Sequence, residues 1–318
     1  MWTDITMIII GLGLLIQGAD WLIKGGGALA RKYHIPELVI GLTVVAFGTS
    51  LPELVVTAFA SGQNHQDLIL GNVIGSNNFN LFVILGVTGL ISPIVVQTGN
   101  VWKEIPISIL AVILLFLLAN NFFIATPGII SRIDGMLLAL LFAAFLYYTF
   151  HQLKKEDSPD EIQSSKLAGY KMWLFILIGI AGLVIGGHLV VSSAVEVAIK
   201  LGISEKIIGL TIIAMGTSLP ELVTSVVAII KKNSDIAVGN IIGSNIFNIF
   251  LILSVSSLIR PITYDVKFDI DLFLLAGGTL FLFVAMFTGI RKKLDRWEAL
   301  VLLVVYGGYI TLLLTDKI

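Results

Sequence analysis

One hexapeptide occurs twice in the chain of 318 residues, each time inside a long apolar run. The copies are Gly48-Thr49-Ser50-Leu51-Pro52-Glu53, within residues 38–60, and Gly216-Thr217-Ser218-Leu219-Pro220-Glu221, within residues 206–230. A charged side chain at bilayer depth costs at least ~2.5 kcal/mol on insertion scales, so a glutamate there indicates a functional site. Glycine and proline loosen a helix, and the freed backbone groups must then face protein or a water-filled cavity. Two such breaks in matching places of two halves are typical of a transporter's binding site.

Composition places the chain among polytopic membrane proteins. It is 57% hydrophobic and 13% charged, with a mean hydropathy of +0.98, whereas soluble domains carry about 25% charged residues. Apolar runs near the ~20-residue spanning length predict an all-α fold with ten transmembrane helices. The predicted helices cover residues 5–30, 37–61, 67–91, 103–120, 132–153, 171–199, 205–230, 235–259, 268–288 and 297–315.

The two halves of the chain repeat at a constant offset of 168 residues, so that Glu53 matches Glu221. Of the 15 residues in 41–55, 12 are identical to their counterparts in 209–223. An internal repeat this close predicts one structural unit that is used twice. We therefore predict a first five-helix repeat over residues 1–153, a cytoplasmic linker over 154–169, and a second five-helix repeat over 170–318.

Helices 2, 3, 7 and 8 of the ten are predicted to be broken. Helices 2 and 7 contain the hexapeptides, and helices 3 and 8 contain Gly75-Ser76-Asn77 and Gly243-Ser244-Asn245. Because five is an odd number, the second repeat enters the membrane from the opposite side, which gives an inverted topology. Loops on one predicted side carry thirteen Lys and Arg residues and those on the other side carry six. The positive-inside rule then places the linker in the cytoplasm and both termini outside, in a multi-pass protein of the plasma membrane.

The polar side chains of the two halves form an all-oxygen set. On a helix, Ser50 and Glu53 are three residues apart, and Thr49 and Glu53 four apart, so these side chains share one side. Hard cations such as Ca2+ take about six to eight oxygen ligands, and the absence of His and Cys from the motifs disfavours softer transition metals. A two-fold axis in the membrane plane would bring both copies together at mid-depth. The candidate metal ligands are Glu53, Glu221, Thr49, Thr217, Ser50, Ser218, Ser76, Ser244, Asn80 and Asn248.

Three further features predict local structure or charge. With both glutamates ionised, the site carries two negative charges, which suits one divalent cation or a few monovalent ones. Ser-Leu-Pro-Glu also fits a capping box, in which Ser50 and Glu53 satisfy free amides at a helix start, and this is compatible with ion binding. Asp67 is a predicted N-cap of the third helix, and Gly25-Gly26-Gly27 predicts close helix packing.

With GNxIGSNxxN following each GTSLPE, the sequence resembles the sodium/calcium exchangers of the cation/calcium antiporter superfamily, in their prokaryotic form without a large regulatory loop. The resemblance implies a ten-helix inverted-repeat antiporter that exchanges Ca2+ for Na+ by alternating access, with the first and sixth helices sliding across the core. It implies calcium ligands at Glu53, Glu221 and the backbone carbonyls of Thr49 and Thr217. Together with the glutamates, the implied sodium ligands are Ala46, Ser50, Ser76, Asn80, Ala214, Ser218, Ser244 and Asn248.

Amides at both Asn80 and Asn248, where many members of that family carry an acid, disfavour coupling to K+. The alternatives are a Ca2+/H+ or K+-assisted antiporter on the same fold and a passive cation channel. An intramembrane hydrolase with Ser50 or Ser218 as nucleophile is disfavoured, because no histidine base lies in the motifs. We expect no enzyme activity, no cofactor, no nucleic acid and no protein partner. The expected partners are the lipid bilayer and, as transported substrates, Ca2+ and Na+.

Overall fold

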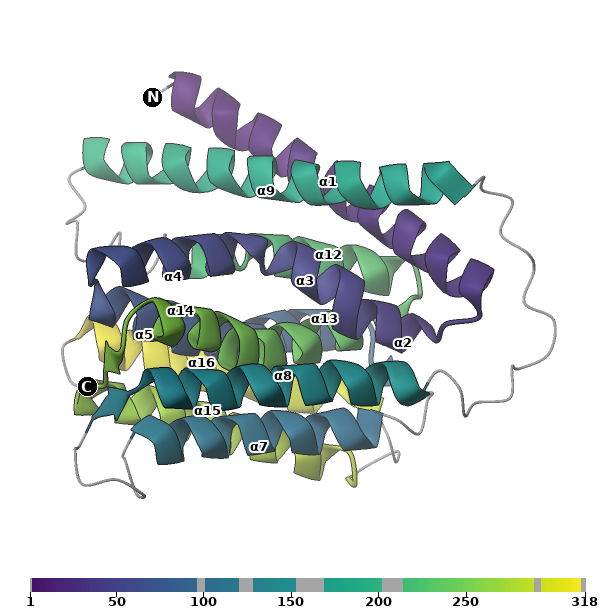
Figure 1. The fold of residues 1–318 in the computed structure, drawn as a ribbon. Coiled ribbons are helices and arrows are strands. Elements are labelled where there is room, and N and C mark those ends of the chain that lie inside the picture. Colours follow the sequence, from purple (N-terminus) through teal and green to yellow (C-terminus); the bar gives the residue numbers. More distant parts are fainter. Residues whose placement is uncertain are drawn as a thin grey trace.

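Long apolar helices lie side by side in the computed structural model of the chain (Figure 1). The structure describes residues 2–95, 101–119, 128–152, 169–201, 214–288 and 293–315. The first half contains α1 (Trp2–Tyr33), α2 (Glu37–Ile40), η1 (Gly41–Val45), α3 (Ala46–Thr49), α4 (Leu51–Gln63), α5 (Gln66–Asn78), η2 (Phe79–Ile84), α6 (Leu85–Ile91), β1 (Ile94–Val95), α7 (Val101–Ala119), β2 (Ile129–Ile130) and α8 (Arg132–Gln152). The second half contains α9 (Gly169–Lys200), α11 (Ala214–Thr217), α12 (Leu219–Ile230), α13 (Ser234–Ile246), η4 (Phe247–Ile252), α14 (Leu253–Ile259), β3 (Ile262–Thr263), η5 (Val266–Phe268), α15 (Asp269–Ala285), β4 (Lys293–Leu294) and α16 (Arg296–Leu314).

The described ranges account for ten apolar helical segments. Seven helices are long and apolar enough to cross a membrane, and Glu37–Thr49 with Leu51–Gln63 forms an eighth span that is bent by 49°. Two shorter apolar helices, Glu104–Ala119 and Leu219–Ile230, complete the ten. These positions match the predicted helices, so the all-helical polytopic fold is confirmed. The predicted linker, apart from Gly169 at the start of α9, and residues 205–213 of the seventh predicted helix lie outside the described residues.

The two hexapeptides break their helices at the serine. Ser50, with φ −83° and ψ 6°, separates α3 from α4, and Ser218, with φ −89° and ψ 6°, separates α11 from α12. Pro52 and Pro220 follow in the first turn of the new helix, where a missing backbone N–H breaks no intrahelical hydrogen bond. The predicted breaks in helices 2 and 7 are therefore confirmed.

Helices 3 and 8 are not broken where the sequence predicted. The chain stays helical through Gly75 in α5 and Gly243 in α13, where the sequence predicted a break. A glycine inside a helix costs only about 1 kcal/mol, which the burial of these helices offsets. The hydrogen bonding instead becomes π-helical from Phe79 in η2 and from Phe247 in η4. Such wide turns are frequent at functional sites.

Two short antiparallel strand pairs join the repeats to each other. β1 pairs with β4, with Ile94 opposite Leu294, and β2 pairs with β3, with Ile130 opposite Ile262. The repeat offset of 168 carries Ile94 onto Ile262. Near the end of each half, Arg132-Ile133-Asp134 matches Arg296-Trp297-Glu298 at an offset of 164, which carries Ile130 onto Leu294. Each strand pair is thus the repeat image of the other, as an inverted two-fold arrangement requires.

The first helices of the two repeats, α1 and α9, cross at one edge of the molecule, with α7, α8, α15 and α16 towards the opposite edge (Figure 1). Glycine makes the crossing close: a Cβ atom at Gly25 would lie 2.9 Å from the backbone nitrogen of Ile176. The predicted close packing at this glycine is confirmed. Asp20 on α1 forms ion pairs with Lys24, at 2.6 Å, and with Lys231 at the end of α12. The second ion pair attaches α1 to the helix that carries Glu221.

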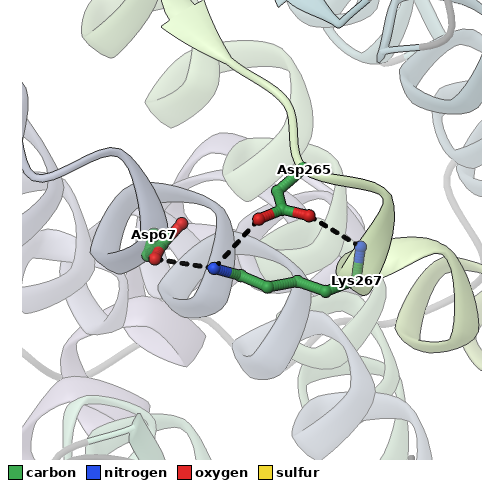
Figure 2. A network of polar contacts seen from close by, with 3 residues as sticks. All are labelled: Asp67, Asp265 and Lys267. Carbon is green, nitrogen blue, oxygen red and sulfur yellow. Dashed lines mark hydrogen bonds and ion pairs between the residues drawn. The ribbon is translucent and has the colours of Figure 1, made fainter.

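An exposed ion network connects the first turn of α5 with η5 (Figure 2). Lys267 Nζ lies 2.7 Å from Asp67 Oδ2 and 3.2 Å from Asp265 Oδ2. The backbone N–H of Lys267 donates to Asp265 Oδ1 at 3.0 Å. This hydrogen bond and, to a lesser extent, the one from the Lys267 ammonium group lower the pKa of Asp265 below its usual value.

The predicted N-cap at Asp67 is wrong, because His65 occupies the N-cap position of α5 and Asp67 lies in its first turn.

Candidate cation site

The two halves place one glutamate each at the start of a helix, in the polar interior of the bundle. Glu53 lies in the first turn of α4 and Glu221 in the first turn of α12, and each is 1% exposed. The partial positive charge of a helix N-terminus favours a carboxylate at such a position. Because a buried carboxylate is costly without partners, the neighbouring groups determine what this pair can bind.

Each glutamate accepts a hydrogen bond from the serine of the other repeat. Ser50 Oγ donates to Glu221 Oε1 at 2.8 Å, and Ser218 Oγ donates to Glu53 Oε1 at 3.0 Å. Ser50 Oγ also lies 3.0 Å from Ser244 Oγ. Neither Ser50 nor Ser218 makes a side-chain capping bond to its own helix, so the capping-box interpretation is wrong. The serines instead bind the two glutamates across the repeat axis.

The threonines of the two hexapeptides are also held by the opposite repeat. Thr49 Oγ1 donates to Asn240 Oδ1 at 3.0 Å, and Thr217 Oγ1 donates to Asn72 Oδ1 at 3.2 Å. The amide nitrogen of each asparagine donates in turn to a hydroxyl on α12 or α4, at 3.0 and 2.9 Å. These bonds fix the backbone on either side of the two helix breaks.

Two amide pairs make the third set of contacts between the repeats. Asn80 Nδ2 donates to Asn245 Oδ1 at 3.1 Å, and Asn248 Nδ2 donates to Asn77 Oδ1 at 3.4 Å. All four side chains are buried. We call Asn80 with Asn245, and Asn248 with Asn77, the crossed amide pairs, because each joins one repeat to the other.

Five buried oxygens of the predicted site have no hydrogen-bond partner among the described residues. They are Glu53 Oε2, Glu221 Oε2, Ser76 Oγ, Asn80 Oδ1 and Asn248 Oδ1. An unsatisfied buried acceptor costs about 1–3 kcal/mol, and more if it is charged. Five such oxygens on four helical segments would be highly unfavourable unless a group outside the chain binds them. Oxygens of these kinds are the ligands that hard cations take in proteins.

The predicted ligands Ala46 and Ala214 take a different place. The Ala46 carbonyl oxygen accepts hydrogen bonds within its own helix, from Ser50 N at 3.0 Å and from Thr49 Oγ1 at 3.2 Å. Ala214 begins α11, three residues before Thr217. The hydrogen bonds between the repeats join the glutamates, serines and amides.

Four asparagines of this centre were not among the predicted ligands. They are Asn72, Asn77, Asn240 and Asn245, and each lies within a copy of GNxIGSNxxN. The available signal was their recurrence at the offset of 168 inside apolar runs, where an amide is costly unless it is hydrogen-bonded. Their oxygens accept hydrogen bonds from the two threonines and from the two predicted amide ligands. These four asparagines therefore contact the predicted ligands.

The chemistry of the donor set fits a hard cation. Within the described ranges, no three His, Cys, Asp or Glu side chains form a group that could hold a metal ion. Apart from the two carboxylates, the oxygens are therefore hydroxyls, amides and backbone carbonyls, which suit Ca2+ and similar ions. With both glutamates ionised, the site carries two negative charges.

Comparison with known proteins decides the family. The family model described as sodium/calcium exchanger protein matches residues 3–151 and again residues 171–315. The chain belongs to this family. The sodium/calcium exchanger MaX1 of Methanosarcina acetivorans is 31% identical over 96% of this chain and 97% of its own length. The inner membrane protein YrbG of Escherichia coli is 38% identical over 80% of this chain and 79% of its own length.

A solved structure has the same fold. The sodium-calcium exchanger NCX_Mj, soaked with Na+ and Sr2+, matches with a TM-score of 0.83 at 32% identity, covering 97% of this chain and 98% of that one. The two family matches coincide with the two predicted repeats, and the resemblance drawn from the motifs is confirmed. The chain is thus a multi-pass membrane transporter and not an enzyme, which removes the intramembrane hydrolase from the alternatives.

Proposed function

We propose that this member of the exchanger family moves Ca2+ against Na+ by alternating access, with both cations binding between α4 and α12. One observation carries the proposal. Each glutamate is held at one oxygen by the serine of the other repeat, and its second oxygen has no partner among the described residues. Two carboxylates, one from each repeat and each with one oxygen free of hydrogen bonds in the described part of the chain, are suitable ligands for a divalent cation.

The proposed division of ligands is the one that the resemblance to the exchanger family implies. Ca2+ binds Glu53, Glu221 and the backbone carbonyls of Thr49 and Thr217. Na+ ions share the glutamates with the remaining oxygens: Ala46, Ala214, Ser50, Ser218, Ser76, Ser244, Asn80 and Asn248. Since both cations need the same two carboxylates, occupancy by one excludes the other, and this competition is the coupling.

Na+ is the proposed counter-ion because the site has no third carboxylate. Asn80 and Asn248 are neutral amides, so the available charge stays at the two glutamates. One Ca2+ neutralises that charge, and a few Na+ ions can do the same. The names of MaX1 and NCX_Mj, which describe sodium/calcium exchange, support the same assignment.

The proposed placement in the plasma membrane has both termini outside and the segment between the repeats in the cytoplasm. It rests on the thirteen Lys and Arg residues of one loop side against six on the other. The description of YrbG as an inner membrane protein agrees with a plasma-membrane location. With this orientation, the ion network at Lys267 in Figure 2 lies on the outer face.

The test is uptake of radioactive calcium into proteoliposomes that contain the full chain and are loaded in turn with Na+, K+ or a proton gradient. Uptake that requires internal Na+ supports the proposal. Uptake driven by K+ or protons alone would reassign the counter-ion while leaving the site in place. Uptake without any counter-ion would contradict exchange and indicate a channel.

A further inference from the structure

The crossed amide pairs carry an inference that rests on the proposed function and extends it. We propose that Asn245 and Asn77 are positioning residues for sodium binding. Each holds the carboxamide of a sodium ligand in the opposite repeat so that the ligand's oxygen faces the cation. Asn245 acts on Asn80, and Asn77 acts on Asn248.

The geometry of a carboxamide makes this control direct. Its oxygen and its NH2 group project from one planar carbon, so a hydrogen bond that fixes the nitrogen also fixes the direction of the oxygen. In Asn80 the nitrogen is bound to Asn245 Oδ1 at 3.1 Å, and the oxygen is buried without a partner among the described residues. The reverse orientation would set two amide oxygens against each other. Asn245 therefore keeps Asn80 Oδ1 turned away from itself.

The second crossed amide pair has the same arrangement as the first. Asn248 Nδ2 donates to Asn77 Oδ1 at 3.4 Å, and Asn248 Oδ1 is likewise buried without a partner in the described part of the chain. The offset of 168 carries Asn77 onto Asn245 and Asn80 onto Asn248. The two equivalent ligands are therefore supported in the same way in both halves.

The pairs also account for amides, rather than acids, at positions 80 and 248. In the observed orientation, the oxygens of Asn77 and Asn245 accept from the NH2 groups of Asn248 and Asn80, and an ionised carboxylate has no such donor. Both ligands are neutral amides, so the charge of the site stays at its two glutamates. Neutral amide ligands at these two positions favour the binding of Na+ and add no negative charge that would strengthen the binding of Ca2+.

The experiment is a pair of double-mutant cycles on the purified full chain. The half-saturating Na+ concentration is measured from the rise in unfolding temperature that the ion produces, with Ca2+ titrated in parallel. One cycle combines Asn80→Ala with Asn245→Ala, which share a hydrogen bond. The control cycle combines Asn80→Ala with Asn77→Ala, which lie in the same helical segment and share none.

Asn245→Ala should raise the half-saturating Na+ concentration about fivefold, the equivalent of one net hydrogen bond of ~1 kcal/mol. In the Asn80→Ala background, the same change should have less than about a twofold effect, because the residue it acts on is already gone. In the control cycle, the effects of the two changes on the half-saturating Na+ concentration should multiply. The half-saturating Ca2+ concentration should change less than about twofold in Asn245→Ala and in Asn77→Ala. Asn245→Asp, which keeps the acceptor oxygen, should not weaken Na+ binding.

Multiplicative effects in both cycles would overturn the proposal, as would a loss of Na+ binding in Asn245→Asp equal to that in Asn245→Ala. Either result leaves the proposed function intact, provided that the wild-type chain is stabilised by both Na+ and Ca2+. A wild-type chain that neither ion stabilises would overturn the proposed function itself. A purely structural role would lower the unfolding temperature without ions and leave the half-saturating Na+ concentration unchanged.

Discussion

The Ser50 hydroxyl of the first repeat donates a hydrogen bond to Glu221 of the second repeat at 2.8 Å, and the Ser218 hydroxyl donates one to Glu53 at 3.0 Å. Each half of the chain thus completes the ligand group of the other. A single repeat would hold a glutamate and a serine that do not bind each other. The duplication is therefore part of the site and not only of the scaffold.

The two glutamates should be indispensable for calcium transport. Glu53→Gln or Glu221→Gln removes one of two charges from a buried site, which costs about 2–5 kcal/mol of binding, or at least about thirtyfold in affinity. Calcium uptake by proteoliposomes should fall to background in both variants. Glu196→Gln, at an exposed position of α9, is the matched control and should retain wild-type uptake. Wild-type rates in either Glu53→Gln or Glu221→Gln would contradict the site assignment.

Ser50→Ala should weaken calcium binding through the glutamate of the other repeat. A hydrogen bond to a charged group contributes about 1.5–3 kcal/mol, so the half-saturating Ca2+ concentration should rise roughly tenfold to a hundredfold. Ser61→Ala is the control on the same helix α4, because Ser61 Oγ donates at 2.6 Å to the backbone oxygen of Ser256, outside the site. Equal Ca2+ titration curves for the two variants would show that the contact with Glu221 plays no part in binding.

Asn248→Asp should alter sodium dependence more than folding. A carboxylate in this place loses the Nδ2 donor to Asn77 and adds negative charge beside the glutamates. The sodium dependence of calcium uptake should change, while the unfolding temperature of the protein without ions should shift little. Sodium dependence identical to that of the wild type would place Asn248 outside the site.

The close crossing of α1 and α9 should be intolerant of a single methyl group. A Cβ atom at Gly18 would lie 2.8 Å from the backbone nitrogen of Leu183 and 2.9 Å from the carbonyl oxygen of Gly179. Gly18→Ala should therefore destabilise the fold by about 1–3 kcal/mol through overpacking, seen as a lower unfolding temperature in detergent. Gly13→Ala is the control on the same helix, since nothing lies within 4 Å of its added Cβ atom. An unfolding temperature no lower than that of Gly13→Ala would mean that the helices separate easily.

Much of this architecture could be predicted from the sequence, because the signals are strong where membrane insertion imposes them. Apolar runs locate the helices, and the offset of 168 identifies the repeat. Serine, proline and glutamate inside an apolar run mark the breaks at Ser50 and Ser218. The break predicted at Gly75 failed, since glycine permits a distortion without imposing one, and the neighbouring packing kept α5 helical until Phe79.

The partners of the site residues could not be predicted in the same way. Helical spacing places Ser50 and Glu53 on one side of a helix, which suggests that they serve one another. The turn at Ser50 instead directs its hydroxyl to Glu221. Contacts across the repeat axis depend on how two segments 168 residues apart meet, and no local spacing encodes that. The hydrogen bonds of Asn77 and Asn245 to the opposite repeat were missed for the same reason.

Ca2+ and Na+ are proposed to compete for the same two glutamates. The most direct measurement is calcium binding to the purified full chain at several fixed Na+ concentrations, with Glu53→Gln as the reference without a complete site. If the two cations compete, Na+ should raise the apparent Kd for Ca2+ while the number of calcium ions bound at saturation stays constant. A calcium Kd that is unchanged by Na+, or calcium binding that persists unaltered in Glu53→Gln, would contradict the proposed competition.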